Sequence, residues 1–321
     1  LFHRIAIIGL CLLTAVFFYQ TLFLGKLPIP TDTLVGLYHP WRDVYASTNP
    51  RGVPFKNFLI TDPVRQQIPW RKMSIDAWKS GHIPSWNPYN FAGAPLAANI
   101  QDAAFYPLNA LFFLFQFPVA WSILVMIQPL LAGLFLYLYL RHLKLSTPAS
   151  FLGSISWSFC GFSVAWMSWG TMMQTAMWLP VILLSIDNVS TARQKFEVIQ
   201  GSVVAVVGVV MAILAGHAQI ALYVILTAAV YSLWRLRNFR LSARLHTIIG
   251  FRLKLILLAG ALLSVAGWLP FLQFLPQTAR LTMAESASRP GWFLPWQNII
   301  QFIAPDFFGN PATLNYWGVW N

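Results

Sequence analysis

Two aspartates in the long polar segment 25–106 have the chemistry of a general base that acts on a hydroxyl group. Asp32 stands about eight residues after an apolar run, and Pro28 and Pro30 stiffen the chain before it. A base must approach the attacking oxygen to roughly 2.6–3.2 Å, and partial burial raises a carboxyl pKa toward the range that suits proton abstraction. Asp32 also fits the N-cap of a following helix, so the sequence leaves both roles open.

Asp62 is the second candidate for the catalytic carboxylate, and its surroundings predict a helix. Pro63 fits the first helical turn with Asp62 as its cap, and Lys79 followed closely by a glycine is typical of a C-terminal end. The sequence therefore predicts an amphipathic surface helix over residues 62–80, with Gln67 among the side chains that contact substrate. The role of a simple cap stays open for Asp62 too.

Aromatic residues recur through the same segment. A Pro-Trp-Arg motif occurs twice, at residues 40–42 and 69–71. Its ordinary interpretation is a short helix on the outer leaflet, with the tryptophan at headgroup level and the arginine on lipid phosphate. Trp86 and Tyr89 lie in a proline-interrupted stretch and suit stacking on a sugar, although an interfacial aromatic belt explains them equally well.

Four further polar residues are candidates for substrate binding. The planar fork of Arg289 matches phosphate oxygens. His217 and Gln219 begin one apolar run, and Gln174 enters another at the same expected depth. Polar groups in an apolar bundle usually line a cavity, so we expect these residues to meet Asp32 and Asp62 under the polar segment.

Composition places the chain among membrane proteins. Of 321 residues, 57% are hydrophobic and 9% are charged, against roughly 25% charged in soluble domains. The net charge of +12 does not indicate nucleic-acid binding, because about half of the Lys and Arg residues lie in short loops between apolar runs. Cys11 and Cys160 both lie in apolar runs, without disulfide or metal spacing.

The apolar runs predict an all-α polytopic membrane protein with about seven spans. They cover residues 5–24, 120–140, 149–169, 172–186, 198–215, 218–234 and 253–275. Basic residues gather in alternate connections, whereas the turns 170–171 and 216–217 contain no Lys or Arg. The positive-inside rule then places the N-terminus in the cytoplasm and both large polar segments outside. We expect a membrane module over 1–275, which includes the loop 25–106, and a truncated outer segment over 276–321 of a longer chain.

Several motifs together resemble a known family. They are Gly81, Pro84 and Trp86-Asn87-Pro88, followed by FAGAPLAANIQ and FYPLN, then GHAQ at 216–219, APDFFGN at 304–310 and YWG at 316–318. The chain resembles bacterial YfhO-type membrane proteins of the GT-C class of glycosyltransferases over essentially its whole length.

The resemblance implies a fold, an activity and a location. The fold would be a GT-C module whose large first outer loop bears the catalytic acid. The activity would be transfer of a sugar from a polyprenyl-phosphate donor to an extracytoplasmic acceptor, such as a cell-envelope polymer, lipid or protein, at the bacterial cytoplasmic membrane. Asp32 matches the early acid after the first span, and Asp62 a second acid of the loop. Paired acids are common at the first position, where this sequence has Thr31-Asp32-Thr33, so a divalent cation is neither required nor excluded.

Two other classes of function compete with glycosyl transfer. A lipid or polymer transporter usually carries ionisable residues inside its spans, and the expected spans here are almost free of charge. A non-catalytic scaffold that binds a partner through its outer loops would keep the same frame.

Overall fold

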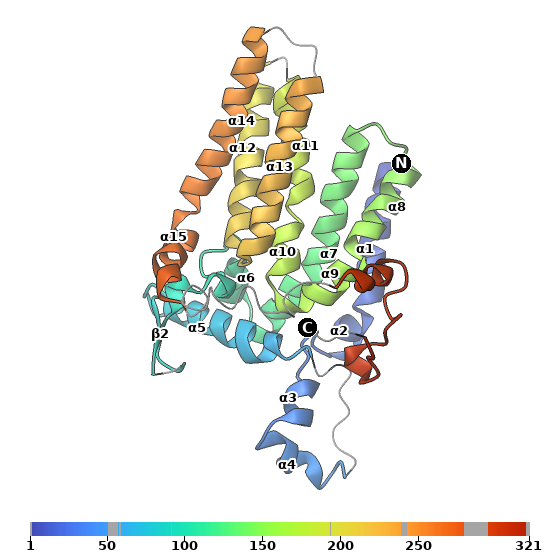
Figure 1. Ribbon diagram of the computed structural model, residues 1–321, viewed down its shortest axis with the longest axis vertical. Coiled ribbons are helices and arrows are strands. Elements are labelled where there is room, and N and C mark those ends of the chain that lie inside the picture. Colours follow the sequence, from blue (N-terminus) through green and yellow to red (C-terminus); the bar gives the residue numbers. More distant parts are fainter. Residues whose placement is uncertain are drawn as a thin grey trace. The chain divides into compact units, whose positions relative to one another are not determined.

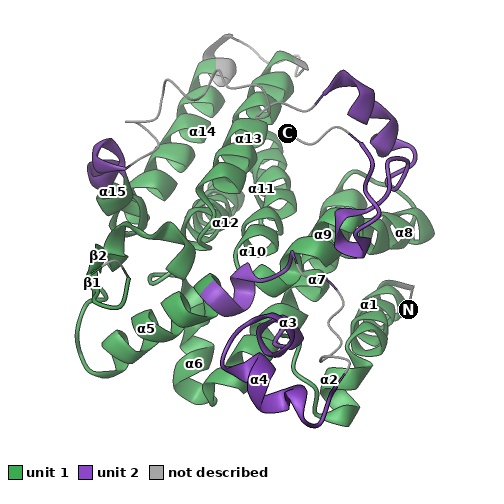
Figure 2. Ribbon diagram, turned by 60° about the horizontal axis from the view of Figure 1, so that its bottom comes forward, with its two compact units in different colours: residues 1–29, 66–271 green, residues 30–65, 272–321 purple. Residues whose placement is uncertain are grey.

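The structure is a computed structural model. It describes residues 2–50, 57, 59–90, 92–192, 194–238, 243–278 and 295–318. This part of the chain is mostly helical, with very little sheet, and forms two compact units. Unit 1 comprises Leu1–Ile29 and Gln66–Phe271, and unit 2 comprises Pro30–Arg65 and Leu272–Asn321 (Figure 2). The compact units thus divide the polar segment between Arg65 and Gln66, and the C-terminal part of the chain between Phe271 and Leu272.

Long apolar helices make up most of unit 1 and lie side by side (Figure 1). Among the described residues, four helices are long and apolar enough to cross a membrane, and a fifth if a bent pair counts as one span. The four are α7 (Phe117–His142), the pair α10 (Met172–Ala176) and α11 (Leu179–Thr191) taken together, α12 (Lys195–Leu214) and α13 (Ala218–Asn238).

Four of the expected spans are not single helices, and the expected fourth span is the pair α10 and α11. The first is divided at Phe18 into α1 (Phe2–Phe17) and α2 (Tyr19–Leu24). The third consists of α8 (Thr147–Ser158), α9 (Gly161–Trp166) and the 3-10 turn η5 (Met167–Trp169).

The last expected span is the bent pair. Helix α14 (Ala243–Leu263) and helix α15 (Val265–Phe274) meet at an angle of 72°. Ser264 lies at the break, and its hydroxyl donates to the carbonyl of Gly260 at 2.8 Å. A serine hydroxyl that bonds back to the preceding turn is a recognised cause of bending in helices.

The remainder of unit 1 is the part of the polar segment that covers one end of these helices (Figure 1). A π-helical turn, η1 (Pro63–Gln67), begins in unit 2, ends in unit 1 and leads into α5 (Ile68–Lys79). A two-residue hairpin pairs β1 (Trp86–Asn87) with β2 (Ala94–Pro95) in antiparallel register. Short turns then connect to the long helix α7: η2 (Leu96–Ala98), η3 (Ile100–Asp102), η4 (Pro107–Ala110) and α6 (Leu111–Leu114).

Unit 2 contains only short helices among its described residues. Two come from the polar segment, α3 (Asp32–Leu37) and α4 (Trp41–Ala46). Three 3-10 turns come from the C-terminal segment: η6 (Leu275–Gln277), η8 (Trp296–Phe302) and η9 (Pro311–Thr313). Within this unit the guanidinium of Arg65 donates to the hydroxyl of Tyr38 at 3.1 Å and lies over that ring.

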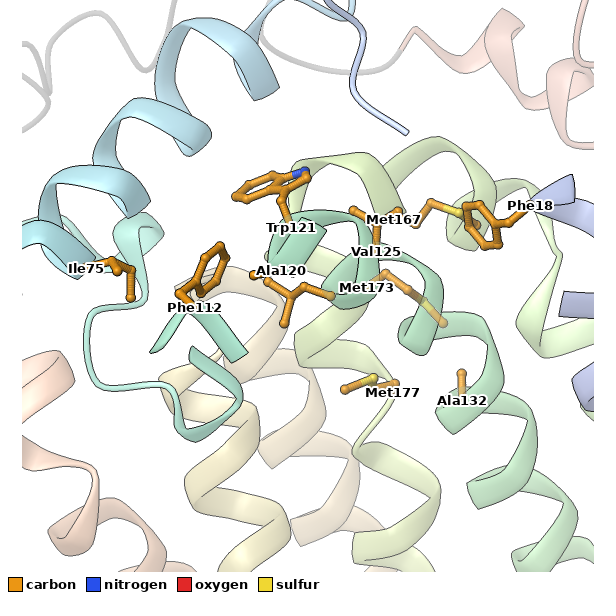
Figure 3. Close-up of a cluster of buried hydrophobic side chains, with 11 residues drawn as sticks. Phe18, Ile75, Phe112, Ala120, Trp121, Val125, Ala132, Met167, Met173 and Met177 are labelled. Atoms are coloured by element: carbon orange, nitrogen blue, oxygen red, sulfur yellow. The ribbon is translucent and has the colours of Figure 1, made fainter. Parts of the chain in front are cut away.

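A buried apolar cluster attaches the polar segment of unit 1 to the bundle (Figure 3). Ile75 of α5 and Phe112 of α6 come from the polar side, while Trp121 and Met173 come from the long helices, and all four are at most 1% exposed. Close approach of the helices elsewhere depends on small residues, as is usual in membrane bundles. A Cβ built at Gly260 of α14 would lie 2.4 Å from Cγ1 of Val209 in α12.

Candidate functional site

A layer of buried polar side chains lies where the polar segment meets the bundle within unit 1. We call Arg71, Ser74, Asp102 and Asn109 the polar layer, and all four are at most 5% exposed. Arg71, Ser74 and Ile75 are three and four positions apart on α5, so they share the one face that this helix buries. The amphipathic helix therefore turns a face that includes a charge, and not only apolar residues, toward the bundle.

Arg71 connects the polar segment to two other parts of unit 1. Its guanidinium donates from Nη1 to Oδ1 of Asn109 at 2.8 Å and from Nη2 to the carbonyl of Gly170 at 3.2 Å. Asn109 in turn donates to the carbonyl of Ala103 at 2.7 Å. Burial lowers the pKa of Arg71 to about 10, although the negative charge of Asp102 acts to raise it. The side chain therefore remains a cation at neutral pH.

Asp102 is the anion of the layer. It accepts a hydrogen bond from the hydroxyl of Ser74 at 2.6 Å and one from the N–H of Ala104 at 3.3 Å. Burial raises the pKa of Asp102 to about 7, although Ser74 and the cation Arg71 both act in the opposite direction. A carboxyl group with such a pKa exchanges its proton near neutrality, which is a property of catalytic groups. The adjoining cavity, however, measures about 10 Å³, which is room for about one water and not for a sugar.

The bundle meets this layer through two turns that contain glycine. The turn between α12 and α13 has Gly216 at φ +98°, and a Cβ there would lie 2.9 Å from Cβ of Ala103 and 3.0 Å from the carbonyl of Ile100. It would also lie 3.2 Å from the side chain of Thr171, next to the carbonyl that Arg71 binds. The backbone of Gly216, in the GHAQ motif, therefore packs directly against residues 100–103 of the polar segment.

Two of the predicted binding residues are buried glutamines. Gln67 is 1% exposed and donates from Nε2 to Oε1 of Gln101 at 2.8 Å. Gln174 of α10 is fully buried, and its amide has no hydrogen-bond partner in the described part of the chain. Burial of an amide without a partner is costly, so Gln174 is the polar group of the predicted set best placed to bind a water or a ligand.

His217 and Gln219 occupy the start of α13 but have local partners. Nδ1 of His217 accepts a hydrogen bond from the N–H of Ile220 at 3.2 Å, which caps the helix, and burial lowers the pKa of this imidazole. The amide of Gln219 is exposed and donates to the hydroxyl of Tyr223 at 2.8 Å. His217 is therefore a neutral capping group at physiological pH.

Trp86 and Tyr89 lie on the hairpin and face outward. Trp86 is 56% exposed, and its ring lies against Gly93, where a Cβ would be only 2.3 Å from Cζ2. Tyr89 is 83% exposed. Both side chains are exposed, so the geometry is compatible with stacking on a sugar and with an interfacial position.

The two candidate catalytic acids both belong to unit 2. Asp32 is the first residue of α3 and is partly exposed, and the N-cap position falls on Thr31, one residue earlier than the capping interpretation required. Asp62 is partly exposed in the first turn of the helix that continues into α5. The third predicted residue of this region, Arg289, lies outside the described residues.

A second charged cluster lies within the bundle, and sequence reasoning missed it. Asp187 of α11 is fully buried and forms an ion pair with Nε of Arg235 at 2.6 Å. The hydroxyl of Tyr231 donates to Asp187 at 2.9 Å, and Nε2 of His142 lies 3.6 Å from its other oxygen. The predicted fourth span ended at residue 186 and left Asp187 in a loop, whereas α11 continues to Thr191 and buries this residue.

Sequence reasoning also misplaced Arg71. Arg71 ends the second Pro-Trp-Arg motif and was expected to contact lipid phosphate, yet it is completely buried. The arginine of the first motif, Arg42, has a side chain that is 53% exposed. The missed signal is the spacing of Arg71, Ser74 and Ile75 on the face that α5 buries. No three of the His, Cys, Asp and Glu residues that the structure describes come together as metal ligands.

Comparison with protein-family models, with curated proteins and with solved structures found no match.

Proposed function

We propose that this chain is a membrane glycosyltransferase of the GT-C type. It would move a sugar from a polyprenyl-phosphate donor to an extracytoplasmic acceptor, such as a cell-envelope polymer, lipid or protein. In this proposal the shorter helices α1–α2 and α8–α9 complete about seven spans of a bacterial cytoplasmic membrane, and the N-terminus is cytoplasmic. The polar segment 25–106 then lies outside, where the donor and the acceptor meet.

The observation that carries the proposal is the polar layer. Hydrogen bonds from Arg71 to Asn109 and Gly170, and from Ser74 to Asp102, fix a polar segment on the end of an apolar bundle. A reaction between a lipid-linked donor and a water-soluble acceptor needs such a support, because its rate depends on holding both reactants in a fixed geometry. A lipid-phosphate leaving group needs no strong acid, so the chemistry requires a base and a cation near the phosphate.

The residues receive the following roles in this proposal. Asp32 takes the proton of the acceptor hydroxyl, and Asp62 is the alternative base. Arg289 neutralises the donor phosphate. Binding contacts come from the remaining candidates of both kinds, polar and aromatic: Gln67, Gln174, His217, Gln219, Trp86 and Tyr89.

A transfer assay tests the proposal. Membranes with the full-length protein are supplied with a radiolabelled polyprenyl-phosphate sugar, and Asp32→Asn is compared with Asp62→Asn. Loss of the base should reduce transfer by about 10²–10⁴-fold. Asp43→Asn is the matched control, because Asp43 lies in the same unit, is exposed and pairs with His39 and Arg42. If Asp62→Asn abolishes transfer while Asp32→Asn keeps it, the base is Asp62, and absence of transfer from every donor tried would favour a scaffold.

The Asp187 cluster favours a second candidate, a lipid or polymer transporter. Ionisable residues buried between membrane helices commonly mark a transport pathway. Reconstituted liposomes separate the two functions, because a transporter moves a labelled polyprenyl-phosphate lipid between leaflets and loses this activity in Asp187→Asn. Retained lipid movement in that variant would remove the support that the cluster gives to transport.

A further inference from the structure

Unit 1 carries an open apolar groove between α5 and α6, which we call the α5–α6 groove. Its volume is about 480 Å³, which is in the range of roughly 300–1,000 Å³ that is usual for sites of small molecules. Aromatic and aliphatic side chains form most of its lining: Trp78, Phe105, Tyr106, Phe113 and Leu114, together with Asn109. All of these residues belong to unit 1, so the groove does not depend on unit 2.

The polar atoms of the lining are already bound within the protein. Nε1 of Trp78 donates to the carbonyl of Ala104 at 3.0 Å. The hydroxyl of Tyr106 accepts a hydrogen bond from Nε1 of Trp178 at 3.2 Å. The amide of Asn109 is engaged by Arg71 and by the carbonyl of Ala103. An occupant of the groove is therefore bound by apolar contact, which suits a hydrocarbon chain better than a sugar.

The position of the groove along the chain places it at the level of lipid headgroups. Helix α6 ends at Leu114, and α7, which has 26 residues and can cross a membrane, begins at Phe117. The rings of Phe112 and Phe117 are 4.8 Å apart and connect these two helices. The outward side chains of α6 are exposed, with Phe113 at 53% and Leu114 at 74%. Exposed apolar residues at the start of a membrane-spanning helix contact lipid.

A cation lies at the rim of the groove. Nζ of Lys79 is 5.8 Å from the centre of the Phe113 ring. A lysine ammonium is a flexible point charge on a long apolar stem, which matches a single phosphate oxygen above a hydrocarbon chain. None of the lining residues is acidic, so nothing in the lining repels an anion.

We propose that the α5–α6 groove is a binding site for a bulk anionic phospholipid. One acyl chain lies between Trp78 and Phe113, and the headgroup phosphate contacts Lys79. The groove is open to its surroundings, and none of its lining residues is among those given a role in sugar transfer, so we assign it an exchanging membrane lipid rather than the sugar donor. This inference does not depend on the proposed sugar transfer. The bound lipid would hold the polar segment on the membrane surface.

Lipid titration of the full chain in neutral detergent tests the site. Phosphatidylglycerol and phosphatidylcholine with identical acyl chains are added separately, bound lipids are counted by native mass spectrometry, and the midpoint of thermal unfolding is recorded. We expect phosphatidylglycerol to bind about tenfold more tightly than phosphatidylcholine, and this preference to fall about threefold or more in Lys79→Gln. Lys72→Gln is the matched control, because Lys72 lies on the same helix but pairs with Asp76. It should keep the preference.

A second variant separates the groove from general surface charge. Ala110 lines the groove and is exposed, so Ala110→Trp should fill the space and abolish the tightly bound lipid without removing a buried contact. Equal binding of the two phospholipids to the original protein would overturn the proposal, as would unchanged binding in Ala110→Trp. Displacement of phosphatidylglycerol by a tenfold lower concentration of polyprenyl phosphate would also overturn it, because the groove would then belong to a donor.

Discussion

The two buried charged clusters of unit 1 use an arginine and an aspartate in different ways. In the polar layer, Arg71 donates to an amide and a carbonyl, and Asp102 accepts from a hydroxyl and an N–H, so each charge is bonded to neutral groups. In the other cluster, Arg235 and Asp187 meet directly at 2.6 Å. The first arrangement connects a polar segment to the bundle, and the second connects helices of the bundle to one another.

This difference determines what each cluster can tolerate. Removal of one member of the direct ion pair leaves one uncompensated charge, and removal of both restores neutrality. The polar layer distributes its charge over several neutral partners from α5, η3, η4 and the turn before α10, so no single second substitution can restore it. The layer should therefore be the more sensitive of the two to substitution.

The largest effect is expected from Arg71→Met. This variant leaves the Asn109 and Gly170 oxygens without a donor and removes the cation that lies near Asp102. We expect a loss of about 3–5 kcal/mol in the free energy of unfolding, measured by chemical denaturation in detergent. Arg42→Met is the control in the matching Pro-Trp-Arg motif, where the side chain is 53% exposed, and it should change the same quantity by less than about 0.5 kcal/mol. Equal losses in both variants would show that burial of Arg71 does not matter.

A double-mutant cycle on the direct pair should give the next largest effect. Asp187→Asn alone is expected to lower the free energy of unfolding by about 2–4 kcal/mol, and Arg235→Gln by somewhat less because its side chain is 21% exposed. The double variant should recover part of the loss, with a coupling energy of about 1–3 kcal/mol. Simple additivity of the two losses would contradict the assignment of a direct pair.

The polar layer should also make the stability of the protein depend on pH, through Asp102. The pKa of Asp102 is raised from 3.8 to about 7 in the folded protein, so between these values the folded chain binds more protons than the unfolded chain. The contribution of Asp102 to stability is therefore complete below about pH 4 and falls as the pH rises to 7, by at most about 1.4 kcal/mol per pH unit. Asp102→Asn should flatten this slope, measured as the unfolding midpoint across that pH range. An unchanged slope in the variant would assign the dependence to another group.

The smallest effect is expected at the surface. Lys72 and Asp76 form an ion pair at 2.7 Å on α5, with both side chains 55% exposed. Lys72→Gln should change the free energy of unfolding by no more than about 0.5 kcal/mol, and this change should vanish in 1 M salt. A larger effect that persists in salt would mean that the exposed pair behaves like the buried clusters.

Local sequence signals predicted the helix of the polar segment well. The helix runs from Asp62 through Lys79, and Gly81 follows at φ +79°, as the proline and glycine signals indicated. The apolar runs also predicted α7, α12 and α13 closely, because each run is long enough and apolar enough to cross a membrane. These features are determined by residues close together in the sequence, and local patterns therefore predict them.

The breaks in the bundle and the polar layer were not predictable in the same way. The run 149–169 contains no charged residue, yet it divides at Phe159 and Cys160. The partners of Arg71 lie 38 and 99 residues away, and no local pattern announces them. Among the candidate site residues, the sequence placed Gln67 on a surface helix, whereas this side chain is 1% exposed.

The hydrogen bond from Arg71 to Gly170 has a consequence for the order of events during synthesis. At roughly 5–20 residues per second, the ribosome adds Gly170 about 5–20 s after Arg71, because 99 residues separate them. Throughout that interval the arginine lacks one of its native acceptors, and docking of α5 must wait until α7, α8 and α9 have been made. The polar segment is thus an early product of translation whose final position is determined late.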